Sequence, residues 1–199
     1  MLVKTYGSAV IGVNALTITV EVDIEAGVNF FLVGLPDNAV KESQQRIEAA
    51  LYNNELKYPG KKIVINMAPA DIRKEGSAYD LTLAIGILAA SEQVNANLLD
   101  QYIIMGELSL DGELKPIKGA LVIAIEARKQ GYKGFILPSA NAREAATVSD
   151  LEIIGAENLR QVVDFLNGKI KIEPTVVNTR EEFYQRLNEY EYDFADVKG

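Results

Sequence analysis

The sequence predicts an α/β fold for most of its 199 residues. Strand and helix patterns alternate along the chain, which is the arrangement of α/β proteins. The hydrophobic content of 48% is enough for one domain with a substantial core. After Gly168 the chain becomes polar and acidic, with few aliphatic residues. We therefore expect one domain over residues 1–168, with mixed sheets, followed by a linker over residues 169–199.

The first half of the domain is expected to contain four strands and two helices. Residues 16–23 alternate between apolar and polar, so their strand is covered on one face only. A helix near residues 38–53 has an apolar stripe of Val40, Ile47 and Leu51 that faces inward. The expected strands are Leu2–Val10, Ala15–Ile24, Phe30–Val33 and a buried strand Ile63–Met67, and the helices run from Asp37 or Asn38 to about Asn53 and over Leu81–Ala90.

The helix over Leu81–Ala90 is the centre of the expected fold. Its only polar side chain is that of Thr82, so the helix must be buried on most sides. Asp80 is expected to cap its N-terminus. The charged loop before it lies between a central strand and this helix, a common place for function. It is either a candidate interaction loop or merely a tight connection, and its candidate residues are Asp71, Arg73, Lys74, Glu75 and Gly76.

The second half continues the alternation of strands and helices, which implies βαβ crossovers and some parallel pairing. Asp111-Gly112 is the strongest short turn signal in the chain and predicts a hairpin over Leu108–Pro116. The other expected strands are Tyr102–Met105, Gly134–Leu137 and Leu151–Ile154, and the helices are Ala120–Gln130, Ala140–Val148 and Leu159–Asn167.

Missing residue types remove several reaction classes. The chain has no His and no Cys, which excludes Ser-His-Asp and Cys-His catalysis and the usual zinc sites. Ser-Lys chemistry, paired carboxylates and magnesium held by carboxylates remain. No phosphate-binding glycine motif is present, so we expect no nucleotide site and no cofactor in these residues. The net charge of −8 argues against broad attraction to DNA. Without a long apolar run or a signal peptide, the expected location is cytoplasmic, with no membrane contact.

Two groups of motifs stand out: Val33-Gly34-Leu35-Pro36-Asp37 with Val40-Lys41-Glu42-Ser43, and Asn66-Met67-Ala68-Pro69-Ala70-Asp71 with Lys74-Glu75-Gly76-Ser77-Ala78-Tyr79-Asp80-Leu81. They resemble the magnesium-chelatase-like AAA+ family that includes ComM and YifB. The resemblance covers about the whole chain and implies that residues 1–168 are the family's bacterial N-terminal domain, with a Lon-protease-like fold of the ribosomal-protein-S-five-like kind. Residues 169–199 then lead into an AAA+ module that is absent here.

The resemblance implies a hexameric motor that acts on branched DNA during recombination and competence. ATP and magnesium are expected in the missing AAA+ module. This domain is expected to be non-catalytic, to contact its own AAA+ module, and to aid assembly or substrate handling, with DNA as a partner of the full-length protein. Two alternatives stay open: an active Ser-Lys peptidase of the Lon type, and a subunit of a magnesium chelatase.

Matching the Lon catalytic motifs to this chain removes both members of the Ser-Lys dyad. Ala78 falls at the nucleophile and Leu121 at the base. Ser77, one residue early, and Lys118, three residues early, are weak substitutes. A slip of one residue at a helix entrance turns a side chain by about 100°, so we expect no catalysis.

A magnesium site and a docking role for the tail are the remaining hypotheses. Asp71, Glu75 and Asp80 are carboxylates of the kind that bind magnesium. We expect them instead to be solvated or paired with Arg73 and Lys74. In the tail, we expect the aromatic residues to dock on the AAA+ module as a hinge; the alternative is a helix packed on the domain itself. These residues are Tyr190, Tyr192 and Phe194.

Overall fold

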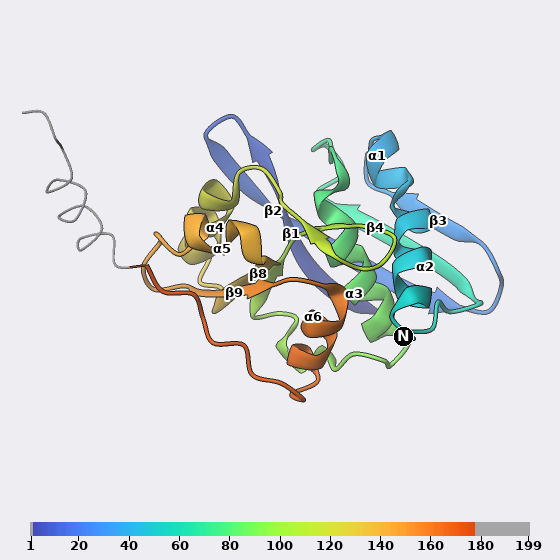
Figure 1. Cartoon of the computed structure of the whole chain (residues 1–199). Helices are drawn as coiled ribbons and strands as arrows, with labels where there is room; N and C mark the ends of the chain where they lie inside the picture. The colour runs from blue at the N-terminus through green and yellow to red at the C-terminus, as the bar shows by residue number, and fades with distance from the viewer. Residues whose placement is uncertain (1, 178–199) are drawn as a thin grey trace, which may run out of the picture.

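The computed structural model of this chain describes residues 2–177. In these residues seven strands form one mixed sheet, in the order β3-β4-β2-β1-β5-β8-β9, and two short strands form a hairpin, β6-β7 (Figure 1). The strands are β1 (Val3–Ile11), β2 (Asn14–Glu25), β3 (Phe30–Val33), β4 (Lys62–Ala68), β5 (Tyr102–Ile104), β6 (Glu107–Leu108), β7 (Leu114–Lys115), β8 (Gly134–Pro138) and β9 (Glu152–Ala156).

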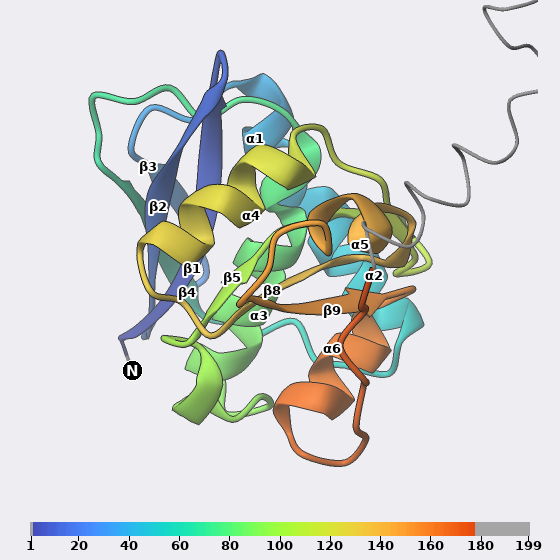
Figure 2. The same ribbon diagram turned by 90° about the vertical axis from the view of Figure 1, so that its left-hand side faces the viewer.

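Helices cover both faces of this sheet. Helix α3 packs on one face of β1 and β2, and α4 packs on the other face of the same strands (Figure 2). The α-helices are α1 (Asn38–Lys41), α2 (Ser43–Asn53), α3 (Asp80–Ala90), α4 (Ala120–Lys129), α5 (Ser139–Ala145) and α6 (Leu159–Leu166), with short 3₁₀ turns at Ser77–Tyr79 and Ala96–Leu98. The mixed α/β fold expected from the sequence is confirmed.

The central helix is as buried as its composition predicts. Every residue of α3, from Asp80 to Ala90, is buried. A Cβ atom at Gly86 would lie 2.7 Å from Cγ2 of Val22, so the glycine lets the helix approach β2 closely. The hydroxyl of Thr82, in the first turn of the helix, donates to the carbonyl of Ile104. The helix therefore connects the two halves of the sheet through both packing and a buried hydrogen bond.

The sequence predictions hold for strand direction and for the hairpin. Strands β5, β8 and β9 are parallel, as the alternation implied. Strands β3 and β4 are also parallel, whereas β2 runs antiparallel to both β1 and β4. Asp111 and Gly112 lie in the turn between β6 and β7, where the amide of Gly112 donates to the carbonyl of Ser109 at 2.9 Å. Side chains of α2 hold this turn, since Asn53 and Asn54 donate to the carbonyls of Leu110 and Asp111 at 2.8 and 2.9 Å.

Three local expectations are corrected. Strand β4 is buried on one face only, because helices cover one side of this part of the sheet; Ile63, Ile65 and Met67 are buried and the residues between them are half-buried. The helix expected up to Asn53 is divided at Glu42 into α1 and α2. Asp80 is the first residue of α3 rather than its cap, because its carboxylate is engaged elsewhere.

The first residues after α6 lie against the domain. The amide of Thr175 donates to the carbonyl of Ile153 at 2.8 Å, and Ile172 packs on the core. The predictions that Tyr190, Tyr192 and Phe194 dock on the AAA+ module, or belong to a helix packed on the domain, lie outside the described residues. Within residues 2–177, no helix is long and apolar enough to cross a membrane.

Candidate functional site

A cavity of about 700 Å³ lies beside the entrance to α3. Its walls come from the end of β1, from the loop after β4, from the 3₁₀ turn Ser77–Tyr79 and from the segment that precedes α4. The cavity therefore brings together residues far apart in the sequence. Ser77, Ala78 and Lys118 line it, so three of the four positions singled out from the Lon motifs meet here. Leu121, the fourth, lies in the first turn of α4 and does not line it.

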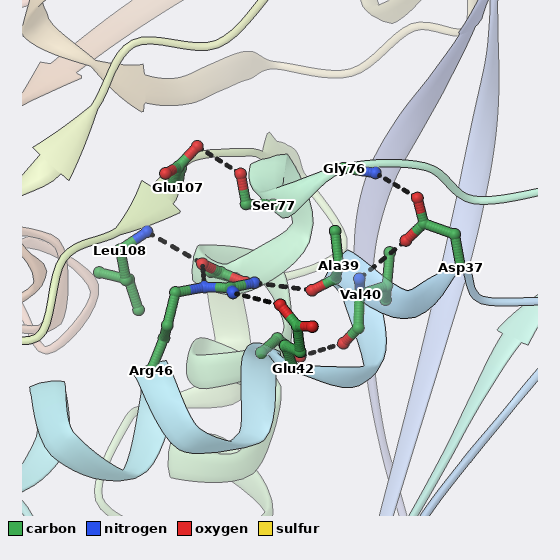
Figure 3. A network of polar contacts seen from close by, with 11 residues as sticks. Asp37, Ala39, Val40, Glu42, Arg46, Gly76, Ser77, Glu107 and Leu108 are labelled. Carbon is green, nitrogen blue, oxygen red and sulfur yellow. Dashed lines mark hydrogen bonds and ion pairs between the residues drawn. The ribbon is translucent and has the colours of Figure 1, made fainter.

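The hydroxyl of Ser77 is engaged by a carboxylate. It donates a hydrogen bond to Oε2 of Glu107, in strand β6 (Figure 3). Ser77 and Lys118 form no hydrogen bond with each other, and Lys118 is exposed. A general base must lie within hydrogen-bond reach of the nucleophile. The structure thus gives Ser77 an acidic partner where a Lon-type dyad has a lysine.

The two positions matched to the catalytic dyad form hydrogen bonds through their backbone groups, and these hold their segments in place. The carbonyl of Ala78 accepts from the amide of Gly106 at 2.8 Å, which ties the 3₁₀ turn to the end of β5. The amide of Leu121 donates to Oε1 of Glu144 at 3.1 Å. Neither a methyl nor an isobutyl side chain supplies a nucleophile or a base.

Glu107 is a site residue that sequence reasoning missed. It comes two residues after the apolar strand expected over Tyr102–Met105, and a charged residue near the end of a buried strand is a weak signal on its own. Its partner Ser77 lies 30 residues earlier in the chain. Only the packing of β6 against the 3₁₀ turn brings the two together.

Next to the 3₁₀ turn that lines the cavity, the buried Asp80 forms an ion pair with Arg46 of α2, whose side chain is 21% exposed. Nε and Nη2 of Arg46 donate to the two carboxylate oxygens of Asp80 at 2.6 and 2.9 Å. The amide of Leu108 donates to the same carboxylate at 3.2 Å, and the Asp80 side chain is 1% exposed. Burial raises the pKa of Asp80 above its usual value, and the Arg46 guanidinium opposes this shift.

Asp80, one of the three carboxylates considered as magnesium ligands, is thus paired with Arg46 rather than with Arg73 or Lys74. Asp71 and Glu75 are exposed, and Glu75 forms an ion pair of 3.1 Å with Arg73. In the part of the chain that the structure describes, no three acidic side chains are grouped closely enough to hold a metal ion.

The candidate interaction loop contains one residue that is not available for contacts. Lys74 is fully buried, so its side chain offers no surface to a partner. Its Nζ donates to the carbonyl of Gly34 at 2.7 Å and to that of Pro69. Burial lowers the pKa of Lys74, and the charge of Asp71 opposes the shift. Lys74 therefore fastens the loop to the end of β3, while Asp71, Arg73 and Glu75 remain at the surface.

Asp37 fastens the same loop from the other side. One oxygen of its carboxylate accepts from the amide of Val40 at 2.8 Å and caps α1, and the other accepts from the amide of Gly76 at 3.1 Å (Figure 3). Gly34 also has a positive φ of 100°, and a Cβ atom there would lie 2.1 Å from the carbonyl oxygen of Met67. The two motif segments thus form one structural unit beside the cavity.

The fold and the site together define the class of this protein: it is a mixed α/β domain with a serine-lined cavity. The chain belongs to the family described as subunit ChlI of Mg-chelatase, whose model matches residues 20–141. It is 41% identical over 195 residues to the competence protein ComM of Haemophilus influenzae and 43% identical over 195 residues to the uncharacterized protein YifB of Escherichia coli.

These alignments take in 98% and 96% of the chain, but only 38% and 37% of the two relatives. The chain thus spans less than two fifths of their length. A more distant similarity, 25% identity over 150 residues, relates 70% of the chain to 18% of a Lon protease of Mycoplasma mobile. This similarity agrees with the Lon-like fold expected from the sequence.

Proposed function

We propose that this chain is a non-catalytic N-terminal domain of a longer AAA+ ATPase, in which it aids the assembly or the substrate handling of a DNA branch-migration motor. The observation that carries the non-catalytic assignment is the hydrogen bond from Ser77 to Glu107. The neighbouring position, Ala78, has no reactive group, and no hydrogen bond brings Lys118 to the hydroxyl of Ser77.

The relatives support the wider proposal. One of them is named a competence protein, a name that agrees with the proposed action on DNA. The greater part of each relative lies beyond the matched residues. We propose that this part contains the ATP and magnesium sites. It would also make most contacts to DNA and to the neighbouring subunits of a hexamer. We propose that the whole protein acts in the cytoplasm. The net charge of the present chain, −8, agrees with a role in assembly or substrate handling rather than in binding DNA directly.

A peptidase assay tests the non-catalytic assignment. The chain and its Ser77→Ala variant are incubated with fluorescently labelled casein, and the release of soluble fluorescence is followed. Both proteins are expected to remain at the background of buffer alone. Hydrolysis by the parent chain that Ser77→Ala or Lys118→Ala abolishes would establish the alternative, a Ser-Lys peptidase.

The supporting role is tested in the full-length protein by removing residues 1–168. ATP hydrolysis is expected to persist, because the proposed module is intact. Hexamer formation, measured by analytical ultracentrifugation, or branch migration on a synthetic Holliday junction is expected to weaken. If both remain at the level of the intact protein, the proposed role is wrong.

A further inference from the structure

One edge of strand β1 is unpaired where it borders the cavity. Its pairing with β2 continues to Ile11 and Asn14, but on the other side β1 pairs with β5 only between Tyr6 and Ile103. Beyond that bridge no further residues of β1 and β5 pair, and β5 ends at Ile104. Residues 8–11 of β1 therefore form part of the cavity wall, with an edge that faces away from β2.

The backbone of Val10 points into this space. The amide of Ser8 donates to Sδ of Met105 at 3.3 Å, so Ser8 faces away from β2. Backbone direction alternates along an antiparallel strand, and Val10 faces the same way. The two-residue turn after Ile11 agrees, because Ile11 and Asn14 close it as the hydrogen-bonded pair. Within residues 2–177, no strand or loop pairs with the N–H and C=O of Val10 on that side.

The surroundings of this free edge are apolar with a modest excess of negative charge. Val10 and Ile11 are 42% and 52% exposed, and Ala78 and Ile117 add apolar surface to the cavity. Asp71 and Glu107 contribute negative charge and Lys118 positive charge, while Arg73 and Glu75 neutralise each other at 3.1 Å. A neutral or basic ligand is therefore favoured over an acidic one.

We propose that the cavity binds an extended polypeptide segment, apolar and neutral or basic, as an additional strand on β1, and does not cleave it. The free N–H and C=O of one residue can both form hydrogen bonds with the backbone of an extended chain that lies beside the strand. The exposed apolar side chains at the edge would be covered by alternate residues of the bound segment. This inference goes beyond the proposed function, since it assigns a class of ligand to the cavity.

The test is a fluorescence-anisotropy titration of the chain into a labelled hexapeptide, Val-Thr-Val-Arg-Val-Thr. Saturable binding is expected, and the same peptide with N-methyl groups on alternate amides is expected to bind at least about tenfold more weakly, because it has lost backbone donors. Replacing the arginine by glutamate is expected to weaken binding at low salt. Equal affinity of the parent and N-methylated peptides, or no saturable binding, overturns the proposal.

Variants of the chain locate the contact. Val10→Pro removes the free amide and is expected to weaken binding about tenfold, whereas Val10→Thr keeps the amide and retains binding. Ala78→Leu narrows the cavity and is expected to weaken binding, with Ala96→Leu, outside the cavity, as its matched control. Thermal unfolding confirms that each variant is folded. If Val10→Pro does not fold, the proposal is judged by the binding of the Ala78→Leu variant and of the N-methylated peptide. If Ala78→Leu binds the peptide as tightly as the parent chain, the peptide binds elsewhere and the proposal is wrong.

Discussion

Nε and Nη2 of Arg46 donate to the two carboxylate oxygens of Asp80 at 2.6 and 2.9 Å. This ion pair joins helix α2 to the first residue of the central helix α3. The remaining contact of the carboxylate is with the amide of Leu108, in β6. The pair therefore holds three elements that support the cavity. Because Asp80 is buried, its charge depends on Arg46 for compensation.

Asp80→Asn is expected to lower the free energy of unfolding by about 3 kcal/mol, because it leaves the Arg46 cation without its buried partner. Urea unfolding followed by circular dichroism measures the loss. Arg73→Gln is the matched control, since it breaks the exposed ion pair with Glu75 and should change stability by no more than about 0.5 kcal/mol. Equal effects of the two substitutions would show that the buried pair contributes no more than a surface pair.

Gly34→Ala is expected to destabilise the chain by more than about 3 kcal/mol, or to prevent folding, because the new methyl group would overlap the carbonyl of Met67 and the backbone has a positive φ. Thermal unfolding measures the effect. Gly60→Ala provides the control, because nothing lies within 4 Å of a Cβ atom there and its φ is ordinary. A Gly34→Ala protein as stable as the Gly60→Ala protein would contradict the close approach of β3 and β4.

Stability is expected to fall as the pH rises above about 10, the usual pKa of tyrosine. Burial raises the pKa of Tyr58 and of Tyr132 to about 12, so between these values the native state keeps protons that the unfolded state has lost. The stabilisation is complete below pH 10 and disappears as the pH passes 12. Lys74 acts in the opposite direction, because burial lowers its pKa below the usual value of 10.5. Its contribution to the free energy of unfolding therefore increases as the pH rises toward 10.5.

Urea unfolding at pH 8, 10 and 11 measures this dependence. Tyr132→Phe is expected to lessen the fall in unfolding free energy between pH 8 and 11, because phenylalanine has no proton to lose. Tyr52→Phe, at a side chain that is 82% exposed, is the control and should leave the fall as it is in the parent. If Tyr132→Phe leaves it unchanged as well, Tyr132 does not contribute to the alkaline loss of stability.

Most of the fold was predictable from local patterns. The alternation in β2, the apolar composition of α3 and the Asp111-Gly112 turn each depend on residues that are neighbours in the sequence. The break at Glu42 was missed because the apolar stripe continues across it, from Val40 to Ile47. The one-sided burial of β4 was missed because a run of Ile and Val is compatible with burial on one face or on both.

The sequence by itself determined which chemistries are absent and which elements form. With no His and no Cys, the common catalytic and zinc sites are excluded whatever the fold. The tertiary structure alone decided the partners of the site residues: Glu107 for Ser77, Arg46 for Asp80, and the carbonyls of Gly34 and Pro69 for Lys74. Ser77 and Asp80 lie 30 and 34 residues from their partners, and Gly34 lies 40 residues from Lys74. Such distant contacts arise from packing between elements, and no local periodicity encodes them.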